Sequence, residues 1–441
     1  MNSYPTYKPS GIEWLGDIPE HWEVKRIKNV SLKVQTGTTP KTAISKYYEA
    51  EDINWFTPVD FSKDILLVNA KNKISQIAID EGAGRFFSKG SVLLLGIGAT
   101  IGKIGILSED SSANQQINSV TFSNKMNSLF AAYSMKIYET EIIKFANFST
   151  LPIFNQSNTS NLIIGIPPKQ EQTAIANYLA EKTSKLDQLI KNKKAQIAQL
   201  KEIRQIEINT AVTKGLNPNA KLKPSGIEWL GDIPEHWEVK RLKEISSIWG
   251  RIGFRGYNKE DIVLDETEGA LTLGAKHISK SNQIRLTDPE YLSWDKYYES
   301  PEIMVKLGDL LIVQRGSIGK FTIVESEIGD ATINPSMILV NQLHIEPKLI
   351  YYILHSKHIQ SIIEVLTSST AVPMISQFQA GTFRIPFSKD RVEQKRIVEH
   401  LDDRVSKLDH LVNNLENQIA QLEEVRKIEI FNAVTGKIKI V

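Results

Sequence analysis

The chain contains no cysteine among its 441 residues. This absence excludes a disulfide framework, a cysteine-ligated zinc or iron–sulfur site, and a thiol nucleophile. It fits a reducing interior, so a cytoplasmic location is expected. No apolar run approaches the roughly 20 residues of a membrane span. The opening MNSYPTYKPSG also lacks the basic-then-apolar pattern of a secretory signal, and we expect no membrane association.

A large excess of one charge is missing as well. The formal net charge is +2, with 41% hydrophobic and 24% charged residues, as in ordinary globular proteins. A dedicated nonspecific nucleic-acid binder usually has a larger basic excess. If the chain contacts nucleic acid, its positive charge must therefore be local, or a partner must supply much of the phosphate contact.

Catalytic motifs are absent or incomplete. GIGATIGKI resembles a phosphate-binding loop, but Ile97 replaces its first glycine and Ile104 stands where Ser or Thr would bind magnesium. NPSM at residues 334–337 lacks the aromatic residue of the amino-methyltransferase motif. His355 and His358 have helical spacing without a convincing third ligand. The sequence therefore predicts a non-catalytic chain that binds no metal or cofactor itself.

One segment of nineteen residues, KPSGIEWLGDIPEHWEVKR, occurs twice without change. It runs from Lys8 to Arg26 and again from Lys223 to Arg241. The chain is therefore two tandem units, each far longer than a solenoid repeat. A segment that is identical in both halves cannot distinguish two different ligands. We expect its tryptophans to form a shared frame or a partner-docking surface: Trp14, Trp22, Trp229 and Trp237.

A second pair of related segments begins at Glu171 and Glu393, and the two align without gaps. Both carry apolar residues at alternating a and d positions of a heptad, which predicts long helices. Ordinary amphipathic helices in separate cores would give similar stripes, but the shared register and length favour a mutual antiparallel coiled coil. Its predicted core residues are Leu179, Leu186, Ile190, Ile197, Leu200, Leu401, Val405, Leu408, Val412, Leu415, Ile419 and Leu422.

The remaining sequence predicts two heads of mixed α/β structure. Short β-rich runs such as SVLLLGIG and DLLIVQRG lie between glycine-containing turns, and other segments have helical spacing. The expected order is a head at 1–168, a helix at 169–214, a second head at 215–388, and a helix with a tail at 389–441. The fold class is thus α+β, or mixed, with an internal pseudo-two-fold repeat.

A short glycine turn recurs in both heads, in SVLLLGIGATIGKIGIL and DLLIVQRGSIGKFTIV. Its Gly102 and Lys103 correspond to Gly319 and Lys320. Exposed backbone N–H groups and a lysine could hold a phosphate, although a tight hairpin with a solvated lysine is an equal alternative. Two further candidates lie in the second turn: Ser317, and Arg315, which occurs in that head alone and could carry specificity.

Further DNA-facing candidates are amides and cations in segments that differ between the heads. Amide side chains are suited to adenine, although these amides could equally cap turns. They are Gln115, Gln116 and Asn118. The divergent openings of the heads add Lys33, Thr38, Lys41, Lys46, Arg251 and Arg255.

These strings in combination resemble the specificity subunit of type I DNA restriction–modification systems, over essentially the whole chain. The resemblance is carried by the duplicated GIEWLGDIPEHWEVKR segment, the QTGTTP…INWFTPVDF opening, the GDLLIVQRGSIGK string, the IPP…EQ entry to the helix, and the AVT ending of both helices. GIGATIGK in the first head departs from the family's usual Arg-Gly-Ser-Ile-Gly-Lys form.

The resemblance implies two target-recognition domains that each recognise half of a bipartite, asymmetric DNA target, and two helices that set the spacer. It implies a subunit without catalytic activity, whose partners are double-stranded DNA, two methyltransferase subunits and two restriction/translocase subunits. S-adenosylmethionine, ATP and magnesium would be bound by those partners. The alternative from the residues alone is a two-headed coiled-coil interaction protein that binds a ligand other than DNA.

Overall fold

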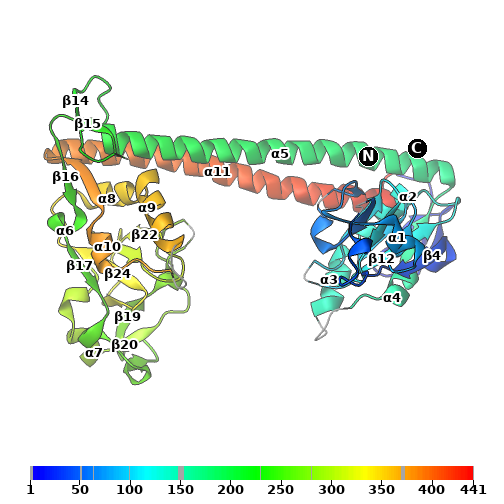
Figure 1. The fold of residues 1–441 in the computed structure, drawn as a ribbon, viewed down its shortest axis with the longest axis horizontal. Coiled ribbons are helices and arrows are strands. Elements are labelled where there is room, and N and C mark those ends of the chain that lie inside the picture. Colours follow the sequence, from blue (N-terminus) through cyan, green and yellow to red (C-terminus); the bar gives the residue numbers. More distant parts are fainter. Residues whose placement is uncertain are drawn as a thin grey trace. The chain divides into compact units, whose positions relative to one another are not determined.

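A computed structural model of the chain describes residues 3–49, 52–62, 64–98, 100–147, 153–228, 230–279, 281–368 and 373–440. The chain divides into two compact units. The first contains residues 1–193 and 417–441, and the second contains residues 194–416. Figure 1 shows the ribbon and the element labels. No helix in the described ranges is both long and apolar enough to span a membrane.

The described part of the first unit's head contains two mixed sheets and four short α-helices. Its five-stranded sheet has the order β4 (Ser31–Thr36), β12 (Ile117–Phe122), β9 (Val92–Leu95), β10 (Ile104–Leu107) and β6 (Leu66–Leu67). Its four-stranded sheet has the order β7 (Asn72–Ile74), β5 (Ile53–Phe56), β11 (Ser111–Ala113) and β8 (Phe86–Phe87). The helices are α2 (Ser128–Lys136), α3 (Glu139–Asn147) and α4 (Gln156–Asn161), and α1 (Gln76–Asp80) is a single turn.

The head of the second unit repeats this plan with two four-stranded sheets. The first has the order β17 (Ser247–Gly250), β24 (Met337–Asn341), β21 (Leu310–Val313) and β22 (Phe321–Ile323). The second has the order β18 (Ile262–Val263), β20 (Tyr291–Ser293), β19 (Gly269–Leu273) and β23 (Ala331–Ile333). Its helices are α6 (Leu242–Ile245), α7 (Trp294–Tyr298), α8 (Pro347–Leu354), α9 (Lys357–Ser368) and α10 (Gln377–Gly381).

The nineteen-residue repeat forms the same small structure in each unit. In the first, β1 (Tyr7–Pro9) and β2 (Asp17–Pro19) form a hairpin, and β3 (Glu23–Arg26) pairs antiparallel with β13 (Ile163–Ile166). In the second, the hairpin is β14 (Leu222–Pro224) and β15 (Asp232–Pro234), and β16 (Trp237–Arg241) pairs with β25 (Arg384–Ser388). The repeat is therefore tied to the strand that leads into each long helix.

The two predicted long helices are present and pack together (Figure 1). They are α5 (Lys169–Lys214) and α11 (Arg391–Val434). The helices run antiparallel in each unit, because the residue numbers of the contacting α11 residues fall as those of α5 rise. In the first unit Lys182 contacts Glu429, and Asp187 contacts Arg426 at 3.1 Å.

The second unit uses the equivalent residues with the roles exchanged. Arg204 contacts Asp409 at 2.9 Å, and Arg404 contacts Glu207 at 2.9 Å. Arg204 and Arg426, at aligned positions of α5 and α11, thus form ion pairs across the helix pair in both units. Such pairs restrict register because a slipped helix would leave a charge without its partner.

Near each head the apolar stripe of the long helices packs into the head core, and further away it lies along the helix pair. Leu179 lies in the core of the first head, with Trp22 and Phe130. Leu401 and Val405 likewise belong to the core of the second head. These three are part of the head cores as well as of the helix stripe. Further from the heads, the stripe residues Leu186, Ile190, Ile197 and Val412 are buried and Leu200, Leu408, Leu415, Ile419 and Leu422 are half-buried.

Candidate nucleic-acid interface

The recurring glycine turn lies beside one particular loop in both heads. In the first head the Gly96 N–H donates to the Gln116 carbonyl at 2.8 Å, so the β9–β10 turn contacts the loop before β12. In the second, the Gln314 N–H donates to the Ser336 carbonyl at 2.9 Å. Both loops contain the same turn, in which an asparagine Oδ1 accepts from the backbone N–H two residues later. Asn114 accepts from Gln116, and Asn334 accepts from Ser336.

The turn lysines are anchored to the main chain. Lys103 Nζ donates to the Phe61 carbonyl at 2.8 Å, and Lys320 Nζ donates to the Ile278 carbonyl at 2.9 Å. Each carbonyl follows a short 3₁₀ helix, η3 (Pro58–Asp60) or η6 (Ala275–His277). The lysines therefore fasten the turn to a neighbouring loop in both heads. This placement matches neither a solvated lysine nor one reaching outward for phosphate.

The turn glycines are required by the backbone. Gly102 has a φ of +91° and Gly319 a φ of +85°, a region that residues with a Cβ rarely adopt. A Cβ on Gly102 would also lie 3.0 Å from the Glu139 carbonyl oxygen of α3. The turn is thus packed against a helix and held at both ends. Ser317 is half-buried within its counterpart in the second head.

The three predicted amides have different environments. Asn118 is 3% exposed, and its Nδ2 donates to the Phe154 carbonyl at 2.8 Å and to Thr159 Oγ1 at 3.0 Å. Gln116 is half-buried, and its Oε1 accepts from Asn114 Nδ2 at 3.0 Å. Gln115 is exposed. Asn118 does not face outward, because its amide links β12 to the segment that contains Phe154 and Thr159 inside the head.

The predicted cations of the first head lie on its surface. Lys33 and Lys41 are exposed. Lys46 is exposed as well, but its Nζ lies 2.6 Å from Glu81 Oε1, and this contact raises the pKa of Lys46. Thr38 is half-buried, and its hydroxyl donates to the Ala83 carbonyl at 3.1 Å. Thr38 therefore holds a loop in place.

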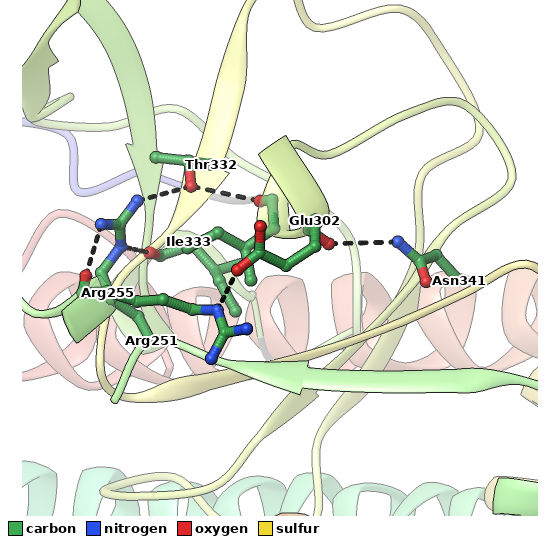
Figure 2. Close-up of polar contacts among 7 residues, drawn as sticks. Arg251, Arg255, Glu302, Thr332, Ile333 and Asn341 are labelled. Atoms are coloured by element: carbon green, nitrogen blue, oxygen red, sulfur yellow. Dashed lines mark hydrogen bonds and ion pairs between the residues drawn. The ribbon is translucent and has the colours of Figure 1, made fainter. Parts of the chain in front are cut away.

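Arg251 is a correction to the sequence-based expectation of an outward-facing cation. It is 1% exposed, and Figure 2 shows its guanidinium hydrogen-bonded inside the head. Nε donates to the Ile333 carbonyl at 2.6 Å, Nη2 to Thr332 Oγ1 at 2.7 Å, and Nη1 to the Arg255 carbonyl at 2.7 Å. These bonds offset the cost of burying the charge. Burial itself lowers the pKa of Arg251.

Arg255 is also engaged within the protein. Its Nε donates to Glu302 Oε1 (Figure 2), and its guanidinium lies over the Trp249 ring at 5.2 Å from the centroid. Arg315, in contrast, is exposed and lies at the surface end of the glycine turn. Its backbone forms an isolated bridge with Met374. Of the three predicted arginines in the second head, Arg315 is the one that faces outward.

The two motifs that resemble metal or nucleotide sites have the following surroundings. No group of three or more potential metal ligands occurs within the described ranges. The glycine turn does not suit a nucleotide phosphate, because Lys103 is bonded to Phe61 and Ile104 begins a buried strand. His355 is buried against Phe321 and Tyr351.

Several known proteins resemble the chain in sequence. Residues 19–201 match the model of the type I restriction modification DNA specificity domain. The chain is 25% identical to the type I restriction enzyme MjaVIII specificity subunit of Methanocaldococcus jannaschii, over 96% of this chain and 94% of that protein. It is 27% identical to the MjaIX specificity subunit of the same organism, over 97% and 95%. Over nearly its whole length the chain is thus similar to type I restriction enzyme specificity subunits.

Solved structures show the same fold. A chain from a study of complex assembly and conformational transition in a type I R-M system has a TM-score of 0.71 and 15% identity, over 95% of this chain and 98% of that one. The HsdS subunit from Thermoanaerobacter tengcongensis has a TM-score of 0.51 and 15% identity, over 96% and 98%. Both likenesses extend across the heads and the long helices.

Two of the repeated tryptophans, Trp22 and Trp237, lie in the cores of the two heads. Trp22 and Trp237 are fully buried, and their indole N–H groups donate to Glu171 at 3.0 Å and to Glu393 at 3.1 Å. Trp14 is 39% exposed and packs edge-on against Tyr138, 4.8 Å between centroids. Trp229 lies outside the described residues.

Sequence reasoning missed the acidic and amide residues at the start of each long helix. His21 also contacts Glu171 at 2.8 Å, and His236 contacts Glu393 at 2.8 Å. The next residues, Gln172 and Gln394, accept from the backbone N–H of Asn127 and Glu346 at 2.8 Å. The Glu-Gln pair that opens both helices was the available signal, because the same dipeptide recurs at the same place.

Proposed function

We propose that the chain is the non-catalytic, DNA-recognising subunit of a type I restriction–modification complex in the cytoplasm. Each head would recognise one half of a bipartite, asymmetric target, and the paired helices would set the spacer between the halves. The observation that carries this proposal is a duplicated frame with different exposed side chains on equivalent surfaces. Its relatives are type I restriction enzyme specificity subunits, and such subunits recognise DNA.

We place the chemistry on partner subunits. Two methyltransferase subunits would bind S-adenosylmethionine, and two restriction/translocase subunits would bind ATP and magnesium. The near-neutral charge of +2 fits a chain whose partners share the phosphate contacts with DNA. The lysines of the glycine turn, which are bonded to main-chain carbonyls, also favour binding by the whole complex over binding by this chain alone.

The long helices carry a duplicated apolar surface that supports two partner copies. Large apolar side chains are exposed at the same three aligned positions of α5 and α11. In the first unit they are Leu189, Val425 and Ile428, which are 48%, 41% and 47% exposed. In the second they are Leu411, Ile203 and Ile206, which are 49%, 43% and 56% exposed. We call these sets the apolar triads.

Each triad combines one residue from one helix with two from the other. Ile203 and Ile206 are three residues apart, so they share one face of α5. Leu411 is close by on α11, because the neighbouring Arg204–Asp409 ion pair fixes the register there. Exposed apolar side chains in the same arrangement twice suit two copies of one helical partner. We infer that each triad docks one methyltransferase subunit.

A stoichiometry measurement tests the docking inference. Leu189→Lys should reduce the number of bound methyltransferase subunits from two to one, and Leu411→Lys should do the same. The double variant should bind none, because a buried lysine in each interface lacks a partner charge. Mass photometry of the co-expressed complex gives the count. Lys194→Glu, an exposed charge reversal on α5 outside both triads, is the matched control. Two subunits retained by the double variant would refute the inference.

An exchange of heads tests the recognition proposal. Residues 1–168 are replaced by the corresponding head of another specificity subunit, and the methylated motif is mapped across the genome. We expect one half of the motif to change while the other half and the spacer persist, because the second head is left intact. A change in both halves, or no bipartite motif in the parent strain, would contradict the proposal.

A further inference from the structure

Each head has a ledge where the glycine turn meets the adjacent loop. In the first head the ledge comprises residues 96–98, 100–103 and 114–116, and in the second, residues 314–320 and 334–336. The strand pairings make the two ledges equivalent where the strands enter the turn and leave the loop, since Ile117 pairs with Leu95 and Met337 pairs with Val313. Residue 97 thus corresponds to 315, and residue 115 to 335.

The exposed hydrogen-bonding side chain lies in the loop of the first ledge and in the turn of the second. The first head has a half-buried Ile97 in the turn and an exposed Gln115 in the loop. The second has an exposed Arg315 in the turn and an exposed Pro335 in the loop. Ile97 and Pro335 offer no side-chain hydrogen bond. Each ledge therefore presents one polar group at these two positions, an amide in one head and a guanidinium in the other.

Gln115 is oriented by a neighbour from the divergent opening of its head. The Thr39 hydroxyl donates to Gln115 Oε1. Among the described residues its amide has no other side-chain partner, so one lone pair of Oε1 and both N–H groups remain for a ligand. That combination of one acceptor and one donor fits the N6 and N7 edge of adenine. Gln116 and Asn118 are less suitable, because their amides already bond to Asn114 and to Phe154.

Arg315 differs from the other two arginines considered for the second head. Arg251 and Arg255 use their guanidinium groups inside the head. Within the described part of the chain, the Arg315 guanidinium has no hydrogen-bond or ion-pair partner, while its backbone is fixed by the bridge to Met374. An exposed guanidinium on an anchored backbone suits the O6 and N7 acceptors of guanine.

We propose that Gln115 recognises an adenine in the half-site of the first head, that Thr39 is its positioning residue, and that Arg315 recognises a guanine in the half-site of the second head. This inference rests on the proposed function. The heads would then differ in specificity because the recognising side chain has moved from the loop to the turn of the same ledge.

The test is selection from a pool of random-sequence duplex DNA by the full chain co-expressed with a type I methyltransferase subunit. Wild type should enrich a bipartite motif. Gln115→Ala should relax one A·T pair in one half, and Arg315→Ala should relax one G·C pair in the other half. Each loss of discrimination should be roughly 5- to 150-fold. Each variant serves as the control for the other, because each leaves the other head unchanged.

Thr39 is tested by a pair of substitutions in the same selection. Thr39→Ser keeps the hydroxyl and should keep discrimination at the adenine, whereas Thr39→Ala should reduce it without removing binding. Equal discrimination in both variants would overturn the positioning role. Thermal unfolding of each variant confirms that the head is intact.

The outcomes separate this inference from the function on which it rests. If wild type enriches no bipartite motif, the proposed function fails and this inference fails with it. If wild type enriches the motif but the variants weaken all duplexes equally and reduce the salt dependence, the side chains contact phosphates and the base assignment is wrong. If the variants leave the motif unchanged, the ledge is not the recognition surface.

Discussion

His355 lies in the core of the second head, beside the rings of Phe321 and Tyr351. Its Nδ1 lies 2.8 Å from the Tyr351 carbonyl, so Nδ1 carries the hydrogen and donates. Among the described residues its Nε2 has no partner. Burial lowers the pKa of His355 to about 4, because protonation would place an unpaired charge and a second N–H donor in the core.

The stability of the second unit should therefore depend on pH. Between the ordinary histidine pKa of about 6.5 and the folded value of about 4, the unfolded chain binds a proton that the folded chain does not. Stability should fall as pH drops through this window, by up to about 3 kcal/mol from this residue near pH 4. Denaturant unfolding at pH 7, 5.5 and 4.5 measures it.

His355→Asn is the informative variant in that experiment. Asparagine keeps a donor for the Tyr351 carbonyl but does not titrate in this range. The variant should lose some stability at pH 7 and show a flatter pH dependence than wild type. An unchanged slope would show that His355 does not cause the acid sensitivity.

The roles of single cations could not be obtained from the sequence. Lys103 and Lys320 were recognised as equivalent, but their acceptors, Phe61 and Ile278, are distant in sequence and carry no motif. Arg251 was expected outside because it lies in the opening of the second head, where the two heads diverge in sequence. The Ile333 carbonyl and the Thr332 hydroxyl come from β23, about 80 residues away in sequence, and only the folded head brings Arg251 beside them.

At the scale of elements, the long helices were the most predictable feature. A heptad pattern over about 40 residues is a local signal, and α5 covers Lys169–Lys214 as the pattern indicates. The sheets were predictable only as short β-rich runs, because strand order depends on pairings between distant segments. β9, for example, lies between β12 and β10, and β11 pairs in parallel with β5.

The antiparallel register makes a specific prediction about spacer length. Lys193 contacts Gln418, and Lys201 contacts Glu416. One heptad added between Lys193 and Lys201, together with one between Glu416 and Gln418, should preserve all the outer pairs. The helix pair would lengthen by about 10 Å. Because DNA rises about 3.4 Å per base pair, the spacer should lengthen by about three base pairs with both half-sites unchanged.

A single insertion is the control. A heptad in α5 alone leaves α11 too short to keep both sets of ion pairs, so we expect a lower melting temperature and weaker DNA binding. Genome-wide mapping of the methylated motif gives the spacer, and circular dichroism gives the melting temperature. An unaltered spacer in a folded double-insertion variant would contradict the proposal that the paired helices set the spacer.

At the scale of the whole molecule, the two units differ in how the chain builds them. The second is one continuous stretch, 194–416, whereas the first needs 1–193 together with 417–441. The first core contains Trp22, Ile175 and Leu179 from the early segment and Ile430 and Val434 from α11. The Tyr7 hydroxyl also donates to the Gly436 carbonyl at 3.1 Å.

Fragments should therefore behave unequally. Residues 194–416 should fold alone, because their core is complete. Residues 1–193 should lack stable structure near Trp22, since the apolar groups that Ile430 and Val434 cover become exposed. Circular dichroism and limited proteolysis distinguish the two cases. Addition of a 417–441 peptide should restore protection to 1–193, and equal protease resistance without the peptide would refute the prediction.

The discontinuous first unit has a consequence for the order in which the protein matures on the ribosome. Translation proceeds at about 5–20 residues per second, so synthesis of residues 194–416 takes roughly 10 to 45 s. Throughout that interval the first head exists without the α11 segment that closes its core. The second head can finish folding as soon as it emerges. The half of the protein that is made first is thus the last to become native.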